Sequence, residues 1–105
     1  MSVLVEFSIF PLDKGESVSE YVARVLKIVK NSGVEYVLTP MATIVETEDP
    51  DSAMELIKKC IKELEKDCNR IILNLKMDYR KGKSGRLTGK VKSVEEKLGE
   101  KLKTI

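Results

Sequence analysis

The sequence has no histidine and no tryptophan, and only two of its 105 residues are cysteine. Histidine is the commonest metal ligand and the commonest general base near neutral pH, so its absence disfavours both kinds of site. Cys60 and Cys68 fall within or at the end of one predicted helix, at a separation of about 12 Å that is too long for a disulfide. No Cys-x-x-Cys pair accompanies them, so we expect two buried thiols, no metal site and no cofactor.

Long apolar runs and a strong charge of one sign are also missing. No apolar run approaches the roughly 18 residues of a membrane span, and the N-terminus leads directly into a predicted strand that contains Glu6 rather than into a signal peptide. The 19 basic and 17 acidic residues leave a net charge of +2, too small to argue for a nucleic-acid or membrane partner. We therefore expect a protein of the reducing cytoplasm.

What the chain does contain is enough hydrophobic sequence for one small core. Hydrophobic residues make up 42% of the chain, and a length of this order predicts a single domain over residues 1–105. Domains of this size often gain stability by associating.

Apolar alternation with a period of two predicts four strands. They cover Val3–Phe10, two strands at roughly 35–39 and 42–47, and Arg70–Arg80. The middle two meet at a tight Thr39-Pro40-Met41 corner, because proline cannot donate to a sheet ladder.

Helical spacing of apolar residues predicts three helices between and after these strands. Ser17 with Glu20 forms a capping box that opens the first helix, and Gly33 ends it. Asp49-Pro50 opens the second helix. After a loop at 81–92, Ser93 with Glu96 opens a short final helix whose apolar seam is Val94, Leu98 and Leu102.

This element order predicts an α+β class protein with a ferredoxin-like βαββαβ sandwich. Two helices cover one face of a four-stranded antiparallel sheet, and a C-terminal helix follows. The uncovered face should carry Leu4, Glu6, Ser8, Phe10, Ile72, Asn74 and Lys76. Its apolar members, with Ile44 from the hairpin, predict association into a dimer or tetramer through this face.

The hairpin over residues 34–48 is the candidate ligand site. Thr39 and Thr43 flank its bend, and Glu46 lies in its second strand. Hydroxyls and a carboxylate among apolar residues suit a pocket for a polar small molecule, although the same residues also suit a half-exposed hairpin.

Enzymatic activity is not expected. Glu6, Glu46 and Lys76 could converge as an acid and base pair, but an ion pair between strands explains them more simply. Hydroxyls such as that of Ser8 would need an adjacent base to act as nucleophiles. We therefore predict no catalytic residue.

The alternative function is nucleic-acid binding through the loop at 80–92. It carries Arg80, Lys81, Lys83, Arg86, Lys90 and Lys92 and no acidic residue, so it could contact phosphates. However, the open sheet face offers at most Phe10 for base stacking. Two other interpretations remain: the loop is basic only because it is exposed to solvent, or the protein is an oligomer without any ligand.

Several phrases together resemble the small thiamine-binding-protein family. They are V-E-F-S-I-F-P-L at 5–12, S-G at 32–33, Y-V-L-T-P-M-A-T-I-V-E at 36–46, K-M-D-Y-R at 76–80 and K-V-K-S-V-E-E-K-L at 90–98. The resemblance covers nearly the whole chain, and it departs at Thr47, where the family pattern has glycine.

The resemblance implies a homo-oligomer, commonly a tetramer built as a dimer of dimers, that binds thiamine or its hydroxymethylpyrimidine part without turning it over. Carboxylate and hydroxyl groups could satisfy the aminopyrimidine edge, and aromatic or thioether side chains could pack on its ring. The residues expected to bind are Ser8, Tyr36, Thr39, Met41, Thr43 and Glu46. Ser8 and Glu46 favour a pocket on the uncovered sheet face, whereas Thr43 favours one under the helices. The sequence therefore does not decide which face of the sheet holds the pocket.

Overall fold

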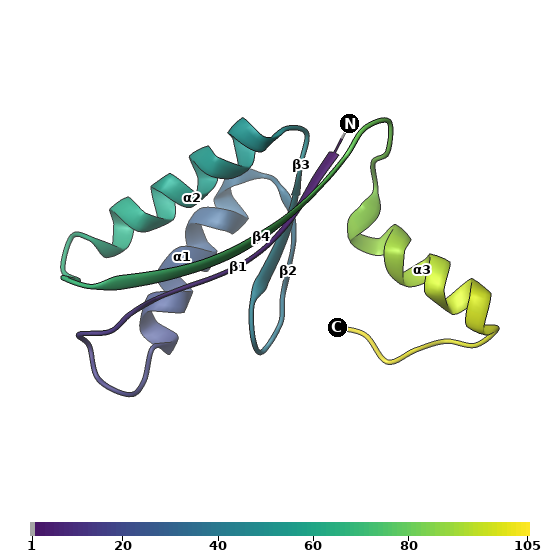
Figure 1. The fold of residues 1–105 in the computed structure, drawn as a ribbon. Coiled ribbons are helices and arrows are strands. Elements are labelled where there is room, and N and C mark those ends of the chain that lie inside the picture. The colour runs from purple at the N-terminus through teal and green to yellow at the C-terminus, as the bar shows by residue number, and fades with distance from the viewer. Residues whose placement is uncertain (1) are drawn as a thin grey trace.

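The computed structural model describes residues 2–105 as a two-layer α+β sandwich with an additional helix (Figure 1). Its elements are β1 (Ser2–Pro11), α1 (Ser19–Ser32), β2 (Glu35–Leu38), β3 (Thr43–Thr47), α2 (Pro50–Leu64), β4 (Ile71–Arg80) and α3 (Arg86–Leu98). The sheet order is β2-β3-β1-β4, and every neighbouring pair is antiparallel. The predicted ferredoxin-like fold with a C-terminal helix is confirmed.

The core lies between the sheet and the two helices α1 and α2. Alternate residues of β1, from Val3 to Ile9, are at most 5% exposed, because the period of a strand turns every second side chain to the covered face. They pack with Val25 and Val29 of α1 and with Ile57 of α2. Both cysteines are free and buried, as expected.

Local capping signals predicted two helix boundaries correctly and two wrongly, one at Ser17 and one at Ser93. The Asp49 side chain accepts a hydrogen bond of 2.7 Å from the Ser52 amide at the start of α2, and Gly33 ends α1 with a left-handed φ of 82°. The Ser17 capping box is wrong, because α1 begins at Ser19 without a side-chain cap. The Ser17 hydroxyl lies 3.5 Å from that of Ser19 instead.

The C-terminal helix is longer than predicted. It begins at Arg86 within the expected loop, so Ser93 lies inside it rather than at its start. The start of α3 lies against the sheet, and the rest projects away from the body (Figure 1). The radius of gyration of 15.1 Å therefore exceeds the roughly 13 Å typical of a compact chain of this length.

The helices of residues 2–105 are all too short or too polar to cross a membrane.

Candidate functional site

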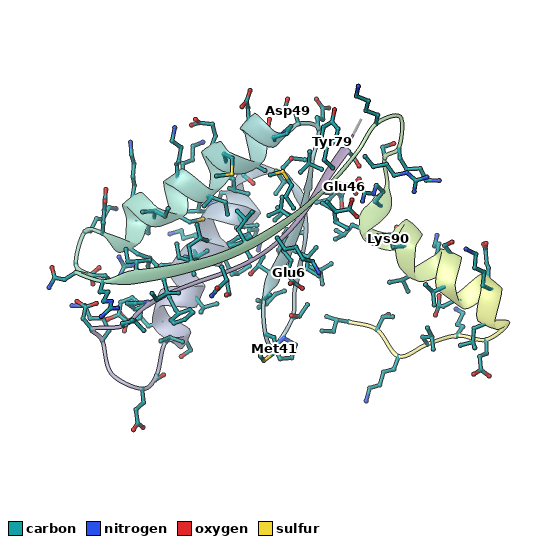
Figure 2. The ribbon with its side chains drawn as sticks, in the orientation of Figure 1. Glu6, Met41, Glu46, Asp49, Tyr79 and Lys90 are labelled. Atoms are coloured by element: carbon teal, nitrogen blue, oxygen red, sulfur yellow. The ribbon has the colours of Figure 1, made fainter. Side chains whose placement is uncertain are left out.

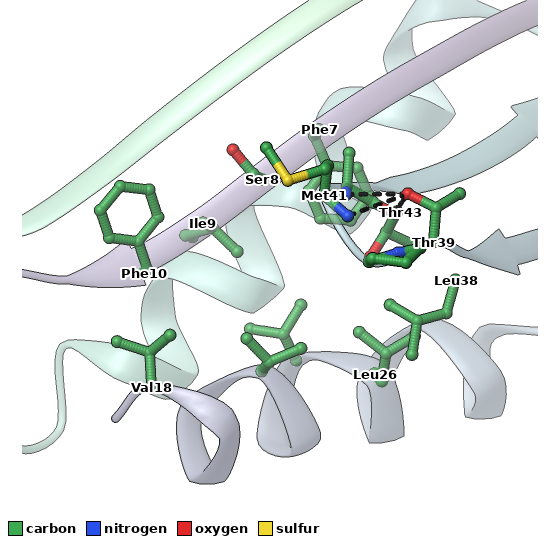
Figure 3. Close-up of a pocket in the computed structure, with 14 residues that line it drawn as sticks. Phe7, Ser8, Ile9, Phe10, Val18, Leu26, Leu38, Thr39, Met41 and Thr43 are labelled. Atoms are coloured by element: carbon green, nitrogen blue, oxygen red, sulfur yellow. Dashed lines mark hydrogen bonds between the residues drawn. The ribbon is translucent and has the colours of Figure 1, made fainter. Parts of the chain in front are cut away.

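A cavity opens where β1 extends beyond the end of β3. The two strands pair only from Val3 opposite Thr47 to Phe7 opposite Thr43, whereas β1 continues to Pro11. The loop from Thr39 to Ala42 and helix α1 enclose the space beside this overhang (Figure 3). Its volume of about 310 Å³ is within the range of small-molecule sites.

The cavity wall is apolar and uncharged. Helix α1 contributes Val22 and Leu26, and β1 contributes Phe7 and Phe10. None of the lining residues within 2–105 has an ionisable side chain. Such a wall favours a flat, uncharged ring over a charged group, because burial of a charge without a partner is costly.

The Thr39 hydroxyl shapes the rim of the cavity. It donates to the Ala42 carbonyl at 2.8 Å and accepts from the amides of Met41 and Ala42 at 3.2 and 3.0 Å. These bonds fix the tight corner predicted from the sequence and leave Met41 86% exposed at the lip. The hydroxyl of Thr39 therefore acts chiefly in folding the loop.

Thr43 is the polar residue set deepest in this wall. It is 5% exposed and stands opposite Phe7, on the sheet face that α1 and α2 cover. The sequence did not decide which face of the sheet holds the pocket. The cavity lies on the face that the helices cover. Ser8 lines the cavity from the overhanging part of β1.

Four of the six predicted binding residues line this cavity, and two do not. Ser8, Thr39, Met41 and Thr43 are brought together. Tyr36 pairs with Val45 on the edge strand β2, away from the cavity. Only the tertiary structure shows that apolar residues of α1, such as Val22 and Leu26, form part of the cavity wall.

Glu46 belongs to a separate polar cluster that holds α3 (Figure 2). Its carboxylate accepts from the amides of Arg86 at 3.0 Å and Leu87 at 3.1 Å, and so occupies the start of the helix as a capping side chain would. Burial raises the pKa of Glu46, but hydrogen bonds from these two amides, together with smaller effects that include the Arg86 charge, lower it overall.

Arg86 is the second anchor of α3. Its side chain is 4% exposed and forms an ion pair with Asp78. It also donates to the main-chain carbonyls of Asp78 at 3.0 Å and Ser2 at 3.4 Å. Lys90 adds a 2.9 Å contact to the Asp78 carboxylate.

These contacts account for two of the six basic residues at 80–92, Arg86 and Lys90. A cleft of about 430 Å³ beside α3 is lined by Arg80, Lys83, Arg86 and Lys90. Asp78 already pairs with Arg86 and Lys90, so half of these cations serve to hold the helix on the sheet.

The structure does not bring Glu6, Glu46 and Lys76 together as one acid and base group. Glu6 and Lys76 are directly opposite each other in the β1–β4 ladder, but the Glu46 carboxylate is directed to the start of α3. Residues 2–105 also contain no group of three or more acidic, cysteine or histidine side chains placed to hold a metal ion.

The fold and cavity define a small ferredoxin-like protein with an uncharged, ligand-sized cavity between a strand overhang and a helix. The chain belongs to the thiamine-binding protein family, whose model matches residues 5–95.

Individual relatives agree with this assignment. The chain is 33% identical over 98 residues to a UPF0045 protein of Mycobacterium bovis, covering 93% of this chain and 96% of the relative. It is 33% identical to a Methanocaldococcus jannaschii protein whose crystal structure matches with a TM-score of 0.82, over 90% of this chain and 97% of that one. A candidate thiamine biosynthesis/salvage protein of Thermotoga maritima shares the fold with a TM-score of 0.78 at 24% identity, over 90% and 99% of the two chains.

Proposed function

We propose that this protein binds thiamine or its hydroxymethylpyrimidine part in the cavity beside Thr43, without covalent chemistry. The observation that carries the proposal is an uncharged, largely apolar cavity of about 310 Å³ with a few hydroxyls at its wall. Most of a small-molecule site is apolar, and a few polar groups orient the ligand.

The two halves of thiamine differ in how well they suit this wall. The aminopyrimidine is flat and neutral and can lie between Phe7, Phe10 and the aliphatic residues of α1. The cationic thiazolium suits the exposed lip near Met41, where it stays in contact with water. The family name and the description of the Thermotoga maritima relative support thiamine as the ligand to test.

Isothermal titration with thiamine and with the free hydroxymethylpyrimidine tests the proposal. Saturable binding of both, weakened by Thr43→Val, is the expected result, because valine keeps the shape of threonine and removes the hydroxyl. Thr47→Val is the matched control: Thr47 is buried on the same strand but donates to the Asp49 carbonyl, outside the cavity. No binding of either ligand would refute the proposal.

We further infer that the working form is a homo-oligomer assembled through α3 and the open sheet face. Val91, Val94 and Leu98 follow one another at helical spacing on α3 and are 37%, 54% and 53% exposed. Lys90 of the same helix lines a groove of about 620 Å³ that includes Leu4 and Ile44 of the open face. Exposed apolar surfaces of this kind mark interfaces, and a second copy of the chain offers the same helix and sheet in return.

Sedimentation velocity tests the assembly. The double variant Val94→Asp/Leu98→Asp should sediment as a monomer, whereas Lys97→Asp changes the charge equally and should retain the assembly. A native protein that is monomeric at high micromolar concentration would contradict the inference.

A further inference from the structure

The main chain of Ile9 occupies an unusual place beside the cavity. In an antiparallel ladder, successive residues turn their N–H and C=O groups alternately to the two neighbouring strands. Which neighbour each residue of β1 faces can be fixed from two separate hydrogen bonds at the ends of the ladders.

The first fixed point is the β2–β3 corner. The Thr39 amide donates to the Ala42 carbonyl at 2.9 Å, so Ala42, and by alternation Ile44 and Glu46, face β2. Thr43 therefore faces β1, where it stands opposite Phe7.

The second fixed point lies on the other side of β1. The Leu12 amide donates to the Arg70 carbonyl at 2.8 Å, which continues the β1–β4 register. Even-numbered residues of β1 therefore face β4, and odd-numbered residues face β3. The two fixed points agree.

Ile9 is the next odd-numbered residue after Phe7, and β3 has ended before it. The register would place Met41 opposite, but the Met41 amide donates to the Thr39 hydroxyl at 3.2 Å instead. Outside the strand ladders, none of the main-chain hydrogen bonds of residues 2–105 involves Ile9. Pro11, the following odd-numbered position, has no N–H to leave unpaired at this edge.

Ile9 is nevertheless 5% exposed, and it lines the cavity. A buried main-chain donor and acceptor need partners. Both groups of Ile9 face the side of β1 from which β3 is missing, and Ile9 lines the cavity there. A bound molecule that offers an acceptor and a donor side by side would complete the ladder where β3 stops.

We propose that the N–H and C=O of Ile9 form the recognition edge of the cavity and pair with the ligand as a β3 residue would. The inference rests on the proposed function and specifies its ligand chemistry: a flat neutral heterocycle with a ring nitrogen beside an exocyclic amino group. The Ile9 N–H donates to the ring nitrogen, and the amino group donates to the Ile9 carbonyl. Because the remaining wall is mostly apolar, this pair sets the orientation of the ring.

The experiment is solution NMR of the ¹⁵N-labelled protein with thiamine ¹⁵N-labelled in its pyrimidine ring. We expect the Ile9 amide to move downfield, to become protected from hydrogen exchange and to show a through-hydrogen-bond coupling to the ring nitrogen. The Phe7 amide, already paired with β3, is the internal control and should keep its exchange rate. In competition with thiamine, 2,4-dimethylpyrimidine should bind at least tenfold more weakly than 4-amino-2-methylpyrimidine, because a methyl group cannot donate to the carbonyl.

The outcomes separate the two proposals. If no resonance changes with thiamine, the proposed function fails. If residues of α1 and the Thr39–Ala42 loop respond but the Ile9 amide does not, or if the methyl and amino compounds bind equally, the function stands and the Ile9 recognition edge is refuted.

Discussion

The carboxylate of Glu46 accepts a hydrogen bond from the main-chain amide of Arg86, which lies forty residues further along the chain, at 3.0 Å. With the neighbouring bond from Leu87, it supplies the cap that the sequence before α3 lacks, since Gly85 stands at that position. Negative charge at the start of a helix also interacts favourably with the helix dipole. The long-range contact therefore decides where α3 begins and how it is held against the sheet.

Removal of this cap should loosen α3 more than the rest of the protein. Glu46→Ala should lower the free energy of opening α3 by about 2 kcal/mol, since hydrogen bonds to a charged group contribute in this range. Hydrogen exchange of the amides over residues 86–98 measures the change. Glu48→Ala is the control, because Glu48 is exposed beyond the end of β3; equal effects of the two substitutions would argue against the cap.

Acid should release the same helix. The pKa of Glu46 is lowered in the fold despite its burial, through the amides of Arg86 and Leu87, and that of Asp78 is lowered by Lys90 and Arg86. Because both pKa values lie below those of the unfolded chain, the stabilisation is present at neutral pH and is lost as the pH falls through the folded values. We expect exchange protection of the Arg86 and Leu87 amides to fall below about pH 4.

The variant Glu46→Gln serves as the control for this titration. Its protection at Arg86 and Leu87 should be weaker at neutral pH and should change less in acid, since only Asp78 still titrates there. If the native protein keeps full protection at these amides down to about pH 2, the electrostatic account of the anchor is wrong.

Ser17 and Asp49, which the sequence predicts as helix caps, should differ in their effect on stability. Asp49→Ala should lower the free energy of unfolding by about 1 kcal/mol, because the side chain caps α2. Ser17→Ala should change it by less than about 0.5 kcal/mol, since α1 starts at Ser19 without a side-chain cap. Urea denaturation of both variants measures the difference. A comparable loss of unfolding free energy in Ser17→Ala would show that Ser17 does cap α1.

Two apolar residues of α2 should also differ. Leu64 is fully buried, whereas Met54 is 41% exposed. Leu64→Ala should lower the free energy of unfolding by about 2–5 kcal/mol, and Met54→Ala by less than about 1 kcal/mol because its side chain is already partly in water. Thermal and urea unfolding test this, and a large effect at Met54 would indicate that the residue is covered in an assembly.

The sequence by itself determined the elements whose signals are local. Period-two alternation in β1 and β4, the Asp49-Pro50 start of α2 and the glycine at the end of α1 all depend on residues within a few positions of one another, and their order defined the ferredoxin-like fold. The Thr39-Pro40-Met41 corner was equally local, because the threonine hydroxyl bonds only to its own loop.

The tertiary structure decided what depends on partners far along the chain. The start of α3 required Glu46, the burial of Arg86 required Asp78 and Ser2, and the cavity required β1 to extend beyond β3 beside α1. How far one paired strand extends beyond its neighbour depends on how the elements pack, and so does the space left where the shorter strand ends. Neither can be read from a single segment. For this reason Ser8, Thr39, Met41 and Thr43 could be selected by residue type, whereas the role of Glu46 and the free edge at Ile9 could not.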